Sequence, residues 1–178
     1  MPRILNPFRR FLRREDGTAT VEFAILVPLL FTIFISALES GLMMVRWVSI
    51  DRAADIVIRQ LRLGQLANPN SELLRREICE ETFLIENCFA NATIEILRIN
   101  RSSFALPEPQ APCVSREEEI IQPVVTITPG QQNDLMLIRV CVTVDAMFPT
   151  SAYALPIQYD AQGGYALAVA SVYVNEPS

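Results

Sequence analysis

The sequence contains no histidine and no lysine, and all fifteen of its basic residues are arginine. Histidine is the commonest general base and the commonest metal ligand, so its absence excludes a Ser-His-Asp or Cys-His nucleophile built within this chain. A zinc site would need cysteines alone, and the sequence has no C-x-x-C pair. We therefore expect no metal site and no cofactor.

The sequence also lacks an excess of basic charge, because its formal net charge at pH 7 is -5. Binding to nucleic acid requires a basic face, so we expect no nucleic-acid partner. The remaining candidates for acid–base chemistry are the carboxylate pairs Glu80-Glu81 and Glu117-Glu118. Adjacent side chains on a helix or a strand diverge and do not converge on one substrate. We therefore expect that the protein is not an enzyme.

Four cysteines are present, namely Cys79, Cys88, Cys113 and Cys141. An even number of cysteines in a chain that looks exported indicates two disulfides, although sequence alone allows three pairings. We favour Cys79–Cys88, which closes a short local loop, and Cys113–Cys141, which would tie a proline-rich loop to a strand. The alternative is that all four are buried free thiols of a cytosolic protein.

A long apolar run extends from Val21 to Val45 and reads VEFAILVPLLFTIFISALESGLMMV. It is long enough to cross a bilayer, which takes roughly 20 residues, and its Pro28 is tolerated in membrane helices. The run contains only two charged residues, Glu22 and Glu39. A twin-arginine signal or a cleavable secretory signal fits less well, because the spacer of the first is missing and the run is too long for the second.

Arginines gather before the apolar run, at positions 3, 9, 10, 13 and 14, and further arginines follow it. The bias is modest, but it favours a cytoplasmic N-terminus and an exported C-terminal domain.

The segment Gly17-Thr18-Ala19-Thr20-Val21-Glu22-Phe23 has basic residues before it and apolar residues after it. It resembles the processing site of type IV pilins, and more closely that of the TadE-like minor pseudopilins of the tight-adherence (Tad/Flp) system. The resemblance is tight over about residues 13–45. Phe23 stands where the Flp major pilins usually have tyrosine, and the chain is far larger than those short pilins. Both differences favour a minor pseudopilin over the major fibre subunit.

The resemblance implies that a prepilin peptidase cuts between Gly17 and Thr18 on the cytoplasmic side of the membrane. It implies that Glu22, the fifth residue of the mature chain, and the adjacent Phe23 serve assembly. It also implies a single-pass protein of the inner membrane with a periplasmic C-terminal domain. The implied partners are other Tad pilins and pseudopilins and the inner-membrane assembly platform, and the implied roles are pilus assembly, adhesion and biofilm formation.

A physical argument supports a role for Glu22. Cleavage would leave a positively charged amine on Thr18, and a carboxylate four residues along a helix lies about one turn away on the same face. Pairing reduces the cost of both charges in a low dielectric, and the partner is either the chain's own Glu22 or a neighbour's. The alternative is a glutamate that snorkels to the membrane surface from the helix of an uncleaved, signal-anchored periplasmic scaffold or binding domain.

The periodicity predicts an α+β fold in which one long N-terminal helix precedes a small domain. The expected parts are a cytoplasmic leader over 1–17, a transmembrane helix over 18–45, an amphipathic extension over 46–66 and a periplasmic domain over 67–178. The extension packs under its own domain, the preferred reading, or against a partner helix. Asn68-Pro69-Asn70 ends the helix.

Within the domain, Ser71 caps a second helix that runs from Glu72 to about Phe83. Alternation then predicts a small antiparallel sheet of about four strands, one face of which the long helix covers. A bulge near Ile96-Leu97 would explain why the apolar face of the first strand switches. The expected strands are 92–99, 122–128, 135–148 and 165–174, and 102–119 is expected to be an exposed loop.

Overall fold

The computed structural model describes residues 18–66, 68–107, 111–116, 123–128, 130–148, 159–160, 162 and 164–176. The predicted leader over 1–17, which includes Gly17, lies outside these residues. In chain order the elements are α2 (Thr18–Arg62), α3 (Ser71–Glu81), α4 (Cys88–Asn91), β1 (Ala92–Ile99), β2 (Leu135–Asp145) and β3 (Gly164–Val174). This is an α+β fold, as the sequence predicts.

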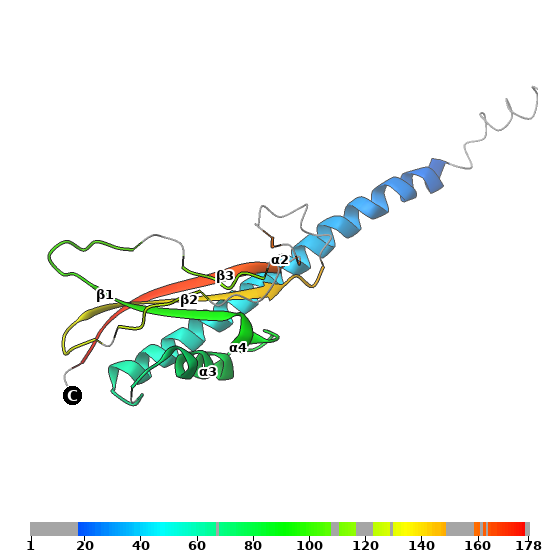
Figure 1. The fold of residues 1–178 in the computed structure, drawn as a ribbon. Helices are drawn as coiled ribbons and strands as arrows, with labels where there is room; N and C mark the ends of the chain where they lie inside the picture. Colours follow the sequence, from blue (N-terminus) through cyan, green and yellow to red (C-terminus); the bar gives the residue numbers. More distant parts are fainter. Residues whose placement is uncertain are drawn as a thin grey trace, which may run out of the picture.

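Helix α2 is one continuous helix of 45 residues with two different halves. Its first half projects beyond the rest of the molecule as a stalk, and its second half runs along the sheet and beside α3 (Figure 1). We call the part of the molecule around the sheet the head.

The end of α2 differs from the prediction, because the helix stops at Arg62 and not near Leu66. Gly64 adopts a left-handed backbone with φ +64°, and its N–H donates to Leu61 O while that of Gln65 donates to Gln60 O. These two bonds form a Schellman motif, in which glycine at this position ends a helix at no steric cost. The predicted stop at residues 68–70 is therefore wrong, and the residue that ends the helix is Gly64.

Helix α3 begins as predicted to within one residue, but its cap is Asn70 and not Ser71. The Asn70 side chain accepts a hydrogen bond from Leu73 N at 2.8 Å, which satisfies one of the free amides of the first turn. The helix ends at Glu81, two residues before the predicted Phe83.

The sheet has three antiparallel strands in the order β1-β2-β3. Strand β1 pairs with β2 without interruption from Ala92↔Val142 to Ile99↔Leu135, so the predicted bulge is wrong. The apolar residues of β1 change face along the strand. Ile94 and Ile96 are buried on the inner face of the sheet, and Ile99 is buried on its outer face.

The predicted strand over 122–128 is also wrong for its described part. Residues 123–128 make only one isolated parallel bridge, between Ile127 and Ile96, and Gln122 lies outside the described residues. The described sheet therefore has three strands, where about four were expected.

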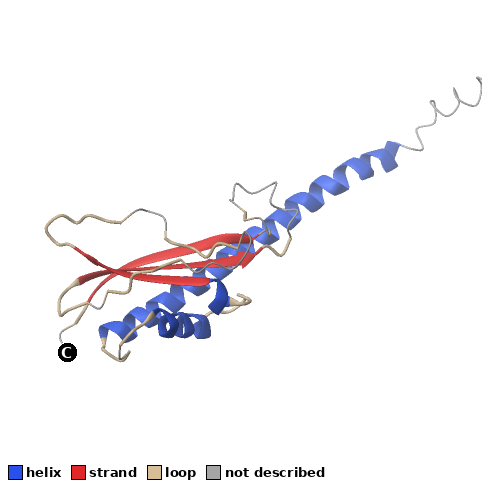
Figure 2. Ribbon diagram, viewed as in Figure 1, coloured by secondary structure: helices blue, strands red, loops and turns tan. Residues whose placement is uncertain are grey.

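Helices α2 and α3 pack on one face of the sheet and form a two-layer head (Figure 2). The β2 face predicted to be apolar lies in this layer, with Ile138, Val140, Val142 and Val144 all buried. The preferred reading of the α2 extension is confirmed, because its apolar stripe packs under its own domain. The buried part of the stripe consists of Ile50, Ala53, Ala54, Val57 and Ile58, with Leu61 packed against it, whereas Val45 and Val48 at the same helical spacing are exposed.

The other face of the sheet is covered in part by the segment 111–116, which was expected to belong to an exposed loop. Val114 is buried, and its carbonyl accepts a hydrogen bond from Thr143 Oγ1. Thr93 Oγ1 donates to Pro112 O in the same region. The expectation fails here because a disulfide holds this segment against β2, as described below.

Candidate functional site

The residues predicted to act in processing and assembly lie at the start of the stalk. Gly17 is outside the described residues, whereas Thr18, Glu22 and Phe23 belong to α2. Thr18 and Glu22 are four residues apart in a helix, so the Thr18 backbone nitrogen and the Glu22 side chain lie about one turn apart. Glu22 is exposed and makes no hydrogen bond or ion pair with another residue that the structure describes. Its carboxylate is therefore available to a partner.

The stalk surface is apolar on all sides. From Ala19 to Leu38 no side chain is buried, and the helix is long and apolar enough to cross a membrane. This stretch of about 20 residues spans about 30 Å, the thickness of a bilayer's hydrocarbon core. The large exposed side chains are Val21, Phe23, Ile25, Leu26, Leu29, Leu30, Phe31, Ile33, Phe34 and Leu38. The stalk is compatible with a membrane anchor.

Two hydroxyl groups in the stalk donate hydrogen bonds within the helix itself. Thr32 Oγ1 donates to Pro28 O at 2.8 Å, and Ser36 Oγ donates to Thr32 O at 2.8 Å. A polar group in hydrocarbon has no water to pair with, so bonds of this kind suit a helix surrounded by lipid.

Glu39 lies at the junction of stalk and head and is only 1% exposed. Its carboxylate accepts hydrogen bonds from the backbone N–H groups of Met147 at 3.3 Å and Phe148 at 3.0 Å, just after β2. It also accepts one from the Tyr165 hydroxyl at 3.5 Å. The head therefore begins to pack on α2 at Glu39, inside the segment that the sequence analysis assigned to the membrane.

Arg46 makes a second connection two turns further along α2. Its Nη1 donates to Asp145 O at 2.8 Å and to the Tyr165 hydroxyl at 3.2 Å, and its Nε donates to Leu84 O at 3.0 Å. Burial raises the pKa of Tyr165 above its ordinary value, although the hydrogen bond from Arg46 opposes this. The phenol is therefore neutral and can donate to Glu39. The sequence analysis assigned no role to Glu39, Arg46 or Tyr165; the isolated glutamate late in an apolar run was the one available signal.

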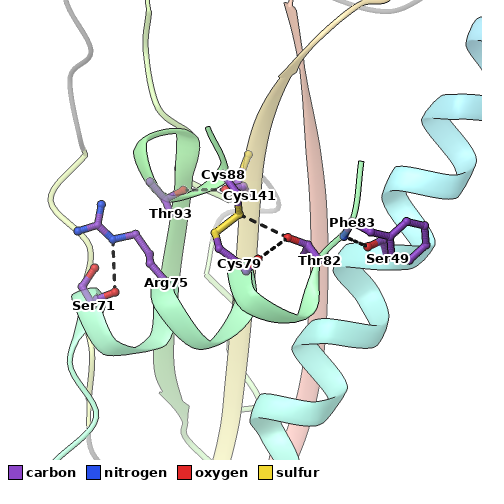
Figure 3. Close-up of a disulfide and its surroundings, with 9 residues drawn as sticks. All are labelled: Ser49, Ser71, Arg75, Cys79, Thr82, Phe83, Cys88, Thr93 and Cys141. Carbon is purple, nitrogen blue, oxygen red and sulfur yellow. Dashed lines mark hydrogen bonds between the residues drawn. A yellow bond between two sulfur atoms is a disulfide. The ribbon is translucent and has the colours of Figure 1, made fainter. Parts of the chain in front are cut away.

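Both predicted disulfides are present. Cys79–Cys88 links the end of α3 to α4, and Cys113–Cys141 links the segment 111–116 to the outer face of β2. Beside the first disulfide, Phe83 N donates to Ser49 Oγ of α2 at 3.0 Å (Figure 3). The disulfide thus closes the loop after α3, and the hydrogen bond from Phe83 attaches this loop to α2.

An ion-pair cluster fixes the start of β3. Arg116 donates to Asp160 from Nε at 2.8 Å and Nη2 at 2.5 Å, and to Asp145 from Nη1 at 2.8 Å. A Cβ at Gly164 would lie 2.8 Å from the backbone oxygen of Val144 and would also displace the Arg116 guanidinium, so glycine suits this position. Burial opposes ionisation, but the bonds to the two carboxylates prevail and raise the pKa of Arg116.

The remaining candidates for acid–base chemistry are the two glutamate pairs. Glu80 and Glu81 lie exposed at the end of α3, and Glu117-Glu118 lies outside the described residues. Among the described residues no three histidine, cysteine, aspartate or glutamate side chains gather where they could hold a metal ion.

Comparison with known proteins gives one match. The model of the family described as TadE-like protein matches residues 17–59. No curated protein and no solved structure matches the chain. The match covers the stalk and most of the α2 segment under the head, and it includes Gly17, Glu22 and Glu39. This part of the chain is therefore TadE-like, which is consistent with a TadE-like protein of the Tad pilus system.

Proposed function

We propose that this chain is a minor pseudopilin that a prepilin peptidase processes between Gly17 and Thr18, and that it takes part in Tad/Flp pilus assembly, adhesion and biofilm formation. The observation that carries the proposal is the TadE-like match, which begins at Gly17 and continues through Glu22 into the head. The proposed cut thus lies at the first residue of the matched region.

The geometry of the stalk supports the same proposal. After cleavage, the new amine of Thr18 and the Glu22 carboxylate would lie one turn apart on one helix. Glu22 has no partner among the described residues, so it is available to its own amine or to that of a neighbouring subunit. A pair between subunits would set the axial register of packed stalks.

In this proposal the stalk is a single-pass anchor in the inner membrane, with the basic leader in the cytoplasm and the head in the periplasm. Two disulfides in the head fit an oxidising compartment. Removal of residues 1–17 takes five arginines and two acids from the fifteen and twenty of the whole chain, and the mature chain has a net charge of -8. The protein acts as a peptidase substrate and a structural subunit, and its partners are other Tad pilins and pseudopilins and the assembly platform.

The experiment is the intact mass and N-terminal sequence of the protein taken from membranes of its host, for the wild type and for Gly17→Ala. We expect a start at Thr18 in the wild type and retention of the leader in the variant. Glu22→Gln is the matched control: it leaves the cut residues unchanged, so a start at Thr18 is expected again. A wild type that retains its leader would refute the proposal and leave an uncleaved, signal-anchored periplasmic domain.

A further inference from the structure

The end of the head that faces the stalk exposes two large apolar side chains, Leu84 and Met147. Leu84 is 56% exposed and Met147 is 55% exposed. Leu84 belongs to the loop after α3, whereas Met147 follows β2, so two segments far apart in the sequence supply them. Both line one cavity of about 190 Å³, together with Arg46 and Glu86, and they therefore lie close together. We call Leu84, Met147 and this cavity the base of the head.

Charged residues of α2 hold both side chains in place. Glu39 accepts the backbone N–H of Met147, and Arg46 donates to the backbone carbonyl of Leu84. These are the first two charged residues of α2 after Glu22. Each of them thus fixes the backbone of one exposed apolar residue against the helix.

The backbone of Leu84 indicates that its exposure is imposed by the fold. Five described residues other than glycine have positive φ, and three of them are asparagine, which tolerates this conformation. Leu84, at φ 60°, is one of the two exceptions; the other is Phe104. A bulky side chain in this conformation is strained, and here the neighbouring bonds Phe83 N–Ser49 Oγ and Arg46 Nε–Leu84 O hold it.

The base lies at the level where the apolar stalk ends. Met147 is bonded to Glu39, the residue directly after the exposed stretch Ala19–Leu38. Arg46 is seven residues further along α2, which is about 10 Å along the helix axis. If the stalk fills the hydrocarbon core, a headgroup layer of about 5–7 Å lies above it, and Met147, at the level of Glu39, lies within that layer. Helical side chains lean toward the N-terminus, so the Arg46 guanidinium lies nearer the stalk than its own Cα does, and Leu84, which it binds and which shares the cavity with Met147, lies at the outer side of the same layer.

We propose that the base of the head is a lipid-contacting surface, in which Leu84 and Met147 enter the interfacial layer of the leaflet from which α2 emerges. The partner is a phospholipid bilayer, because the base continues the stalk surface that faces lipid. Two apolar side chains beside a helix that already crosses the membrane gain from burial there and hold the head at a fixed height and rotation. The inference rests on the proposed membrane anchoring of α2.

The test uses the full chain in phosphatidylcholine nanodiscs, with one environment-sensitive fluorophore on an introduced cysteine and nitroxide-labelled phosphatidylcholine as the quencher. The four native cysteines are in disulfides, so the introduced thiol is the one that reacts. The test variants are Leu84→Cys and Met147→Cys. Phe104→Cys is the matched control, because Phe104 also has a positive φ (47°) and is 65% exposed, but lies beyond β1 at the far end of the head.

We expect the nitroxide lipid to quench the probes at 84 and 147 and to leave the probe at 104 unchanged. Equal, negligible quenching at all three positions would overturn the inference. So would probes at 84 and 147 that are shielded from water but not quenched by lipid, because a protein surface would then cover the base. The two test positions lie on separate segments, so a label that disturbs one loop leaves the other as a test.

A fourth probe separates this inference from the proposed anchoring. Phe31→Cys places the fluorophore midway along the exposed apolar stretch of the stalk. Quenching at 31 without quenching at 84 and 147 refutes the lipid-contacting base alone. Absence of quenching at 31 refutes the membrane anchor and the base together.

Discussion

Glu39 Oε2 accepts a hydrogen bond from the backbone N–H of Phe148 at 3.0 Å, although the two residues are 109 positions apart in the sequence. The bond joins the apolar N-terminal helix to the end of the central strand. A carboxylate in an apolar run is costly unless it is paired, and here backbone N–H groups and a tyrosine hydroxyl supply the pairing. Glu39 is therefore satisfied by hydrogen bonds within its own chain, whereas Glu22 has no partner among the residues that the structure describes.

Replacement of Glu39 by glutamine is expected to weaken the attachment of the head to α2. The amide presents one acceptor and one unwanted donor to the N–H groups of Met147 and Phe148, so we expect a loss of about 1–3 kcal/mol in the free energy of unfolding. Trp47, the single tryptophan, donates from Nε1 to Ala168 O of β3 and therefore reports contact between α2 and the sheet. Denaturant unfolding of the full chain in detergent, followed by its fluorescence, measures the loss.

Glu22→Gln is the matched control for this prediction, because it makes the same change on the same helix at an exposed position. We expect its free energy of unfolding to stay within about 0.5 kcal/mol of that of the wild type. Equal losses in the two variants would contradict the role assigned to Glu39.

Acid is expected to destabilise the head through Asp160. Burial acts to raise the pKa of Asp160, but the hydrogen bonds from Arg116, Gly164 and Gln162 outweigh it and lower the pKa below 3.8. A carboxyl whose folded pKa is lowered stabilises the fold above its unfolded pKa, and this contribution disappears as the pH falls through the folded value. The window is therefore below about pH 4.

The measurement is the unfolding midpoint as a function of pH for the wild type and for Asp160→Asn. The asparagine variant cannot ionise at this position, so its stability should fall less steeply in the acid window. Parallel curves for the two proteins would show that the ion pair with Arg116 adds nothing to the acid dependence.

The parts of the fold that the sequence predicted are those set by local patterns. The apolar run predicted α2, strict alternation predicted both faces of β2, and the spacing of Cys79 and Cys88 favoured their disulfide. The misses have non-local causes. Alternation in 123–128 does not make a strand because those residues find only one bridge, to Ile96. The composition of the segment 111–116 indicates an exposed loop. The favoured disulfide from Cys113 to the distant Cys141 is present, but its consequence, a segment packed on the sheet, does not show in the local pattern.

The candidate site shows the same difference between local and non-local signals. Glu22 could be proposed as a site residue from the sequence because its whole motif lies within a few residues, and its role stays a prediction. The connections between α2 and the head could not be predicted, because Glu39 and Arg46 bind residues 84, 145, 147, 148 and 165, which are far away in the sequence. No local pattern near Glu39 or Arg46 specifies those partners.

The two disulfides are expected to contribute unequally to stability. Cys113–Cys141 spans a sequence separation of 28, and Cys79–Cys88 spans 9. In the loop-closure account the longer loop restricts the unfolded chain more. Cys113–Cys141 should therefore add about 1 kcal/mol more to the free energy of unfolding than Cys79–Cys88 does. Replacing each pair by serines and measuring denaturant unfolding in detergent checks this. The loop-closure account would be contradicted if removal of Cys79–Cys88 lowered the free energy of unfolding as much as, or more than, removal of Cys113–Cys141.

Glu22→Ala is expected to separate assembly from processing. The proposed cut between Gly17 and Thr18 is several residues before Glu22, so the variant should still reach the membrane and start at Thr18. It lacks the carboxylate that would pair with the new amine of Thr18, so the amine remains unpaired in a low dielectric. The expected result is a processed protein with a normal head that no longer copurifies with other pilus components.

The readout is N-terminal sequencing together with the composition of sheared pilus fractions, compared among Glu22→Ala, Glu22→Asp and the wild type. Aspartate keeps the charge on a shorter side chain, so partial recovery is expected if pairing is the cause. Full assembly of the alanine variant would remove Glu22 from the mechanism and leave it as a residue at the membrane surface. Loss of processing in that variant would instead place Glu22 in recognition by the peptidase.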